Sequence, residues 1–287
     1  MKQSVRSAAV AGTFYGADPA MLRRQLQSVD LPEPVPGACA CMVPHAGYVF
    51  SMPTALRTLA AARRNKTFSK AVVIGPSHRS FFTGATVAEF SNWATPFGSV
   101  EADAQSLELL ANDPIPEMHF DNAPHLQEHS IEVQLPLLQY LFEGIKIVPV
   151  LAGQLDLRSA TALGKRLAQL HTPNTFWVIS GDFTHYGRNF NYTPFGLPVD
   201  PQKLNTLDRE AAEFIAAGDI PGVAAFLNRT HATICGINPA VLFLKTMEAA
   251  GVSITGKVTE VTDSGVVSKD FNHIVGYAGI LFTENEK

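Results

Sequence analysis

Cysteine is scarce in this chain of 287 residues, which contains only Cys39, Cys41 and Cys235. Such a small, odd number does not build a disulfide framework, so we expect the protein to reside in the reducing environment of the cytoplasm. Basic runs are also lacking and the net charge is −4, which disfavours nucleic acid and anionic membranes as partners. No apolar stretch is long enough to cross a bilayer, and the N-terminal segment makes a poor signal peptide. These absences favour a cytoplasmic protein.

Three common catalytic motifs are absent as well. The sequence contains no GxGxxG, Walker A or GxSxG pattern, so nucleotide binding and the α/β-hydrolase mechanism lose their usual support. Apolar residues nevertheless make up 46% of the chain and charged residues only 17%, which is enough for a large core. We therefore expect a folded protein whose chemistry lies outside those classes.

Apolar runs and helical patterns alternate along most of the chain. This order predicts a single α/β domain over residues 1–287, with a mixed β-sheet core flanked by helices. The strands are expected at 38–44, 70–76, 146–153, 175–182, 252–262 and 273–282. The helices are expected at 21–29, 53–64, 103–112, 128–142, 157–170, 201–217, 220–228 and 238–250.

Several local signals refine this outline. Asp18 is predicted to cap the first helix and Ser51 the second. Pro136 must either kink its helix or start a new one. Residues 81–102 are expected to form an antiparallel excursion, and residues 184–200 a long loop beside the site.

Two histidines come directly after expected strands. His45 comes after the strand at 38–44, and His78 comes after Gly-Pro at the end of the strand at 70–76. The ends of parallel strands share one rim of a sheet, where ligands bind. A lone histidine there is more often structural, but two in matching contexts favour a shared metal site.

Asp182 and His185 lie at the end of a third expected strand. On a helical turn their i, i+3 spacing would place both on one face, where they could supply a ligand and a general base. Alternatively, Asp182 caps the next turn and His185 binds a carbonyl group. We favour a functional role for His185 because of its position at a strand end.

Cys235 precedes the helix expected at 238–250. The helix dipole favours a thiolate at this position, which would make Cys235 a metal ligand or a redox-active thiol. A buried, inert cysteine is an equally good interpretation.

His125, Glu128 and His129 form a further group. The histidines are spaced i, i+4, but the HExxH order of metalloproteases is absent. The first turn of a helix could hold one acid–base histidine here, or Glu128 could serve the helix dipole alone. The remaining histidines are interpreted as structural or surface residues.

Six ordered motifs together resemble the MEMO family, whose bacterial and archaeal members are known as AmmeMemoRadiSam system protein B. They are RSAAVAGTFYGADPAML, VPHAGYVFSMPTA, VIGPSHRSFFTGA, EHSIEVQLPLLQYL, VISGDFTHYGRNF and CGINPAVLFL, and they extend from residue 6 to about residue 245. This family is similar in fold to the class III extradiol ring-cleaving dioxygenases, which hold non-haem Fe(II) with two histidines and a carboxylate.

The resemblance implies a role for each candidate residue. It places His45 and His78 on the two histidine ligand positions, and Cys235 on the position of the carboxylate ligand. It places His185 on the acid–base position with Asp182 beside the metal, and His129, in preference to His125, on that of a further active-site histidine. Cysteine departs from the dioxygenase pattern, because a thiolate shifts the metal preference toward copper or zinc.

Three functions remain in view. The first is a mononuclear oxidoreductase holding Fe(II), or copper, that acts on an unknown small-molecule substrate. The second is a binding or accessory protein that works with a radical-SAM partner and an AMMECR-like protein, as the system name implies. The third is a zinc hydrolase, which lacks an obvious substrate motif.

Overall fold

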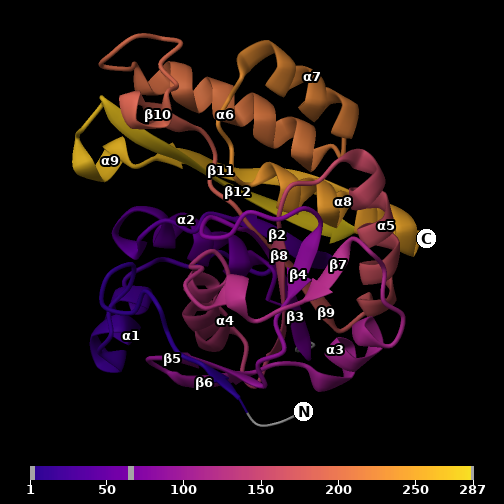
Figure 1. The fold of residues 1–287 in the computed structure, drawn as a ribbon. Helices are drawn as coiled ribbons and strands as arrows, with labels where there is room; N and C mark the ends of the chain where they lie inside the picture. Colours follow the sequence, from indigo (N-terminus) through magenta and orange to yellow (C-terminus); the bar gives the residue numbers. More distant parts are fainter. Residues whose placement is uncertain (1–3, 64–67, 286–287) are drawn as a thin grey trace.

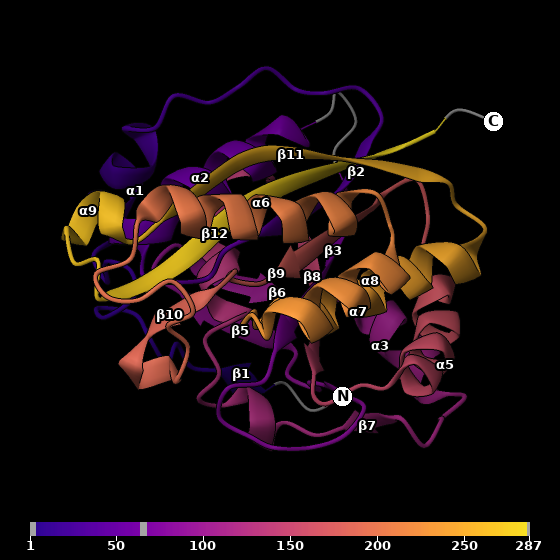
Figure 2. The ribbon, with the colours of Figure 1, turned by 90° about the horizontal axis from the view of Figure 1, so that it is seen from above.

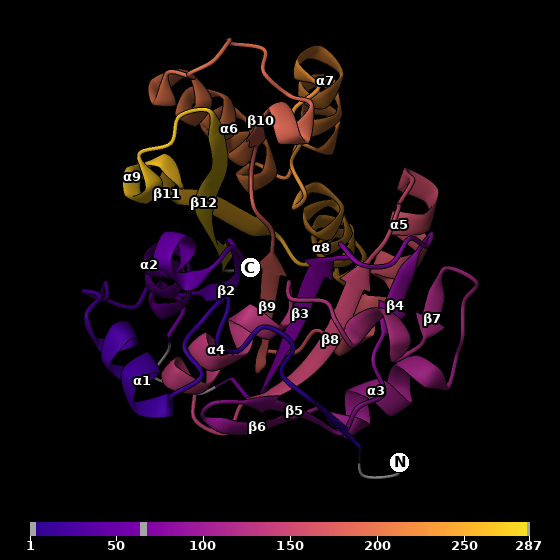
Figure 3. The ribbon, with the colours of Figure 1, turned by 60° about the vertical axis from the view of Figure 1, so that its left-hand side comes forward.

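Four parallel strands form the centre of the computed structural model, which describes residues 4–63 and 68–285. They are β2 (Ala38–Val43), β9 (Thr175–Ser180), β3 (Lys70–Pro76) and β8 (Lys146–Ala152), side by side in that order. Figure 3 shows them next to one another across the lower part of the molecule. The predicted α/β class is therefore confirmed, and all four central strands lie where the apolar runs place them.

Further strands extend both edges and make the sheet mixed, as expected. On one side β12 (His273–Glu284) pairs antiparallel with β2, and both β11 (Ile254–Asp263) and β10 (His185–Gly187) pair with β12. On the other side β4 (Ala85–Val87) pairs antiparallel with β8 and parallel with β7 (Met118–Phe120). The described chain thus builds a nine-stranded sheet.

A small second sheet uses part of the expected 81–102 excursion. In it β5 (Asn92–Thr95) pairs antiparallel with β6 (Gly98–Glu101) and parallel with β1 (Val5–Arg6). The antiparallel excursion is confirmed, but its strands are divided between the two sheets. The parallel partner β1 comes from the N-terminal segment, where Val5 pairs with Asn92, and no local pattern indicates it.

Helices cover both faces of the main sheet (Figures 1 and 2). One apolar cluster joins the central strands to the first, second and fourth helices, and another joins them to the remaining long helices. The first group comprises α1 (Pro19–Gln27), α2 (Tyr48–Ala61) and α4 (Leu135–Leu141). The second comprises α3 (Ala104–Ala111), α5 (Leu157–Leu167), α6 (Pro201–Ala216), α7 (Ile220–Thr230) and α8 (Ile237–Ala250); the short α9 (Gly265–Ser268) joins β11 to β12.

Alternation along β3 shows how one strand serves both clusters. Ala71 and Val73 belong to the cluster with α2, whereas Val72 and Ile74 belong to the cluster with α8. All four are fully buried. Because successive side chains point to opposite faces of a strand, a strand between two layers of helices must be apolar throughout. Each Val or Ile buried in this way contributes about 1.5–3 kcal/mol.

Two of the local predictions at helix ends hold and one is wrong. Asp18 caps α1 through a 2.7 Å bond from the Met21 N–H, and Pro136 lies in the first turn of α4, so the helix begins afresh there. Ser51 is not a cap, because α2 already begins at Tyr48 and the Ser51 hydroxyl donates to Ala46 O. The last residue of the helix expected at 53–64 lies outside the described residues, as do residues 1–3 and 286–287 of the expected domain.

The segment 184–200 is mostly loop, as expected, but it includes β10 and a short 3-10 turn. This strand brings His185 onto the edge of the sheet. None of the helices in the described chain combines the length and the apolar character that a membrane span requires.

Candidate metal centre

The structure brings three of the predicted ligand residues to one place. His45 lies two residues beyond β2 and His78 two residues beyond β3, on either side of β9. Their ring centroids are 5.1 Å apart. One ligand atom from each of His45, His78 and Cys235 can be chosen so that all three lie within 4.8 Å of one another. The rim shared by two parallel strand ends brings His45 and His78 together, and the segment before α8 (Ile237–Ala250) adds Cys235 from far along the chain.

His45 is held in a defined tautomer. Its Nδ1 lies 3.0 Å from Ser180 Oγ, and that hydroxyl donates its only proton to Ser130 O. Gln134 Nε2 also donates to Ser180 Oγ, at 3.0 Å. Since the Ser180 hydroxyl has no second proton to give, Nδ1 of His45 must be the donor. The lone pair is then on Nε2, which faces Cys235 Sγ at 3.4 Å.

Glu128 orients the other two histidines of the cluster. Its Oε1 accepts from His78 Nδ1 at 3.0 Å and lies 3.2 Å from His129 Nδ1, while Oε2 accepts from the His78 backbone N–H at 2.5 Å. The two rings stack, with centroids 4.7 Å apart and planes 24° apart. With both Nδ1 atoms on one carboxylate oxygen, both Nε2 atoms are left free. A carboxylate behind an imidazole in this way is the usual support of a metal ligand.

The hydrogen bonds around Glu128 favour the ionised form of its carboxyl group. Burial raises the pKa of this carboxyl group, but the hydrogen bonds and charge of His78, aided by His129, outweigh burial and lower the pKa to about 2. The backbone N–H groups of His129 and Ser130 donate to Glu128 Oε1 at 2.9 and 3.0 Å. The sequence offers two interpretations of this segment, a helix turn that holds an acid–base histidine or a Glu128 that serves the helix dipole alone. The expected helix begins only at Leu135, and residues 126–131 form an irregular turn around the carboxylate.

Two glycines bring Cys235 to His45. A Cβ on Gly181 would lie 2.4 Å from Gly236 Cα, so the two backbones meet at a distance that no side chain permits. Gly236 N also donates to Asp182 O. Cys235 lies at the start of α8, as predicted, but burial and the nearby Asp182 raise the pKa of its thiol well above normal. The helix dipole does not produce a thiolate here, so a metal would have to displace the proton.

Asp182 supports the turn that carries His45. Its Oδ1 accepts from the His45 backbone N–H at 2.7 Å, and its Oδ2 lies 3.9 Å from His45 Nε2. Burial raises the pKa of this carboxyl group to about 7, against the lowering effect of the backbone bond from His45. Asp182 does not cap a subsequent turn, and its carboxylate borders the candidate ligand set.

His185 reaches the cluster from β10 and not from a helical turn. The helical turn on which the i, i+3 spacing would matter does not form, because Phe183 N donates to Gly276 O and Gly276 N donates to Thr184 O, which holds the segment extended against β12. The His185 Nε2 atom is buried and has no hydrogen-bond partner within the described chain. Burial, together with the charges of His78 and other histidines, lowers the pKa of His185 to about 4. Its imidazole is therefore neutral at pH 7 and can accept a proton.

Of the two histidines in the 125–129 group, only His129 lies in the cluster. Its ring centroid is 5.3 Å from that of His45, and burial lowers its pKa to about 4. His125 binds Thr86 Oγ1 at 3.1 Å and packs on Trp93, away from these rings. Because residues 125–129 do not form an α-helix, the i, i+4 spacing does not place these two histidines on one face.

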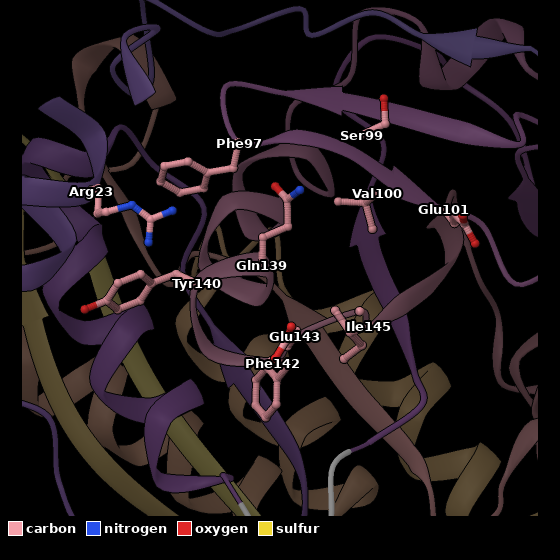
Figure 4. Close-up of a pocket in the computed structure, with 11 residues that line it drawn as sticks. Arg23, Phe97, Ser99, Val100, Glu101, Gln139, Tyr140, Phe142, Glu143 and Ile145 are labelled. Carbon is pink, nitrogen blue, oxygen red and sulfur yellow. The ribbon is translucent and has the colours of Figure 1, made fainter. Parts of the chain in front are cut away.

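A cavity of about 270 Å³ opens beside the candidate ligands. His78 and Cys235 line it, together with apolar side chains that include Phe81, Phe82 and Ile237. A larger cavity of about 510 Å³, shown in Figure 4, lies between α1, β6 and α4, and no member of the histidine cluster lines it. The smaller cavity is thus the one with access to the cluster.

The donor set fits a single transition-metal ion. Two atoms bound to one ion at tetrahedral angles, with bonds of about 2.0 Å to nitrogen and 2.3 Å to sulfur, are separated by about 3.5 Å. The 3.4 Å between His45 Nε2 and Cys235 Sγ matches this separation. Imidazole and thiolate donors suit iron, copper and zinc better than magnesium or calcium.

Comparison with known proteins gives a consistent result over nearly the whole chain. The family model described as Memo-like protein matches residues 6–281. A MEMO1 family protein of Methanopyrus kandleri is 35% identical over 96% of this chain and 98% of its own length. One from Thermococcus onnurineus is 32% identical, over 97% and 99%. An uncharacterised Escherichia coli K12 protein of known structure is 16% identical, with a TM-score of 0.46, over 85% of this chain and 99% of its own.

Proposed function

This chain belongs to the Memo-like protein family, and we propose that it is a metal-dependent oxidoreductase acting on a small molecule. The ligands in this proposal are His45, His78 and Cys235. The observation that carries it is that these donors lie within 4.8 Å of one another beside a cavity, with both imidazoles oriented from behind. Structural histidines need no such convergence of free nitrogen atoms.

Fe(II) is the metal we expect, with copper or zinc as the alternatives that the cysteine favours. When bound, a ferrous ion supplies open coordination positions and redox chemistry toward O2. The residues that would hold it are His45 and His78 through Nε2, since each Nδ1 is engaged by Ser180 or Glu128, together with Cys235.

His185 is the proposed base. Its neutral imidazole has a buried Nε2 without a partner in the described chain, and this atom can take a proton from a substrate hydroxyl group. His129 presents a second free Nε2 across the cluster, because Glu128 holds its Nδ1. Asp182 acts as a positioning residue that fixes the His45 turn through the backbone.

A second candidate function rests on Cys235. A thiolate donor next to an imidazole binds copper or zinc tightly and does not require turnover. In this alternative the chain is a metal-binding accessory protein that serves a radical-SAM partner and an AMMECR-like protein. The two candidates share the site and differ in reactivity toward O2.

Metal analysis and O2 uptake test both. The protein is purified without oxygen or added metal, loaded with Fe(II), and assayed for bound metal and for O2 consumption with a panel of catechols. We expect one metal ion per chain, and loss of that ion in His45→Ala and in His78→Ala. His119→Ala is the matched control, because His119 is exposed and lies outside the cluster.

The outcomes separate cleanly. O2 consumption that depends on Fe(II) and on His185 supports the oxidoreductase. A bound metal without any O2 consumption supports the accessory protein. Full metal occupancy in both ligand variants would contradict the metal site itself.

A further inference from the structure

The loop that carries His78 is rigidly held on both sides. Ser77 Oγ donates to Ser80 O at 2.7 Å and accepts from Ser80 N at 3.3 Å, which closes a tight turn. Glu128 Oε2 accepts from the His78 N–H inside this turn, and Gln154 N donates to Phe82 O just beyond it. The backbone of this loop is therefore held in a defined position.

Arg79 is the next residue of this loop, and it lines a second cavity. That cavity, of about 480 Å³, is bounded by Arg79 and Ser80 on one side and by Pro124 and Gln127 on another. Ser80 also lines the cavity beside His78 and Cys235, so the two spaces adjoin at one residue. A ligand that passes over Ser80 would contact both.

Arg79 is the only permanently charged residue among the described residues that line these two cavities. Its guanidinium has neither an ion-pair nor a hydrogen-bond partner within residues 4–63 and 68–285. Arg79 directly follows His78, a member of the histidine cluster, along the chain. An unpaired cation thus stands at the edge of the histidine cluster in a protein whose net charge is −4.

The cavity nearest the cluster contains several apolar side chains among polar ones. Phe81, Phe82, Ile234 and Ile237 line the cavity that contains His78 and Cys235. Unpaired surface arginines are common, and Arg158 is another exposed one, but Arg158 lines neither cavity. An unpaired guanidinium on a well-held loop, apolar side chains in the adjoining cavity and free imidazole nitrogens together fit a molecule that is apolar along its body and anionic at one end.

We propose that Arg79 binds the carboxylate of a small substrate whose apolar body lies against Phe81 and Phe82 and whose other end reaches His78 and Cys235. The assignment rests on the proposed function for the identity of the reacting end. It adds the substrate class, an apolar carboxylate, and the residue that selects it. The planar guanidinium can hold a carboxylate through two parallel hydrogen bonds.

Binding of a matched pair of probes to the metal-free protein tests the assignment. Phenylacetate and its neutral isostere phenylacetamide are titrated into chelator-treated protein, with binding followed by ligand-observed NMR. We expect phenylacetate to bind about tenfold more tightly than the amide, because hydrogen bonds to charged groups are the strong ones. Added salt should reduce the difference.

Variants locate the preference. Arg79→Gln should abolish it, Arg79→Lys should retain part of it, and Arg158→Gln should leave it unchanged. Equal binding of the two probes to the unmodified protein would overturn the assignment, and so would an unaltered preference in Arg79→Gln. If the protein fails to bind metal in the loading experiment but still prefers phenylacetate in an Arg79-dependent way, the proposed function is contradicted and this assignment is supported.

Discussion

Substitution of Glu128 by glutamine tests how the histidine cluster is supported. The carboxylate accepts from the backbone N–H groups of His78, His129 and Ser130 and from His78 Nδ1, with His129 Nδ1 at 3.2 Å. Glutamine keeps one acceptor oxygen and turns the other into an amide donor. Whichever way the amide is placed, at least one buried N–H group meets another donor.

The expected cost comes from these contacts. An unsatisfied buried donor costs about 1–3 kcal/mol, and the remaining bonds lose the assistance of a charged acceptor. We expect Glu128→Gln to lower the free energy of unfolding by about 3 kcal/mol, which corresponds to roughly 6 °C in a chain of this size. Loss of a carboxylate behind metal-ligating imidazoles should also weaken metal affinity about 10–100-fold.

Two assays separate these effects. Urea unfolding of the metal-free protein reports the stability term, and competition with a coloured chelator reports metal affinity. Glu108→Gln, on an exposed face of α3, is the control for removal of one negative charge. Metal affinity within threefold of the unmodified protein in Glu128→Gln would refute the orienting role of this residue.

Three further predictions concern the frame around the site. Gly276→Ala should destabilise the fold by more than about 3 kcal/mol in urea unfolding, because the new Cβ would lie 1.7 Å from Asp208 Oδ2. Burial raises the pKa of Asp208 from 3.8 to about 7, so the folded state keeps a proton that the unfolded state releases. In the unmodified protein the free energy of unfolding therefore falls by up to about 4 kcal/mol as the pH rises from about 4 to about 7. Asp208→Asn should remove this part of the pH dependence. Gly181→Ala should push Gly236 away. We expect a larger loss of metal-binding free energy, from chelator competition, than of unfolding free energy, from urea.

Each of these has an outcome that would count against it. Gly16→Ala is the control for the glycine variants, because nothing lies within 4 Å of its Cβ position. Stability of Gly276→Ala equal to that of the control would show that the Asp208 contact is easily relieved. Equal loss of stability between pH 4 and pH 7 in Asp208→Asn and the unmodified protein would assign the pH dependence to other groups. Unchanged metal affinity in Gly181→Ala would show that the glycine contact does not position Cys235.

The proposed ligand residues could be predicted from the sequence because the ends of buried strands can be predicted from it. His45 and His78 come just after apolar runs, and neighbouring parallel strands deliver the residues beyond their carboxyl ends to one rim. Cys235 was placed at a helix start by Gly236 and Pro239, and it lies there. Its meeting with His45 depends on the contact of two glycine backbones, which no local pattern indicates. The resemblance, and not the periodicity, supplied that pairing.

The supporting residues were harder to predict, since their segments have no regular structure. Glu128 and His129 lie in a turn shaped by the Glu128 side chain itself, so helical spacing was a poor guide. The strand that carries His185 was not predicted, because β10 is only three residues long and its partner β12 comes about 90 residues later. Ser180 and Gln134, which fix the His45 tautomer, are ordinary buried polar residues in the sequence. Their role is visible only once their partners are in place.

X-ray absorption of the metal-loaded protein measures the central claim most directly. With one ion per chain, we predict two nitrogen scatterers at about 2.0–2.1 Å and one sulfur scatterer at about 2.3 Å. The sulfur contribution should vanish in Cys235→Ser and remain in Cys39→Ser, whose thiol is buried in the core. A first coordination shell made of light atoms alone in the unmodified protein, or a sulfur signal that survives in Cys235→Ser, would contradict the proposed ligand set.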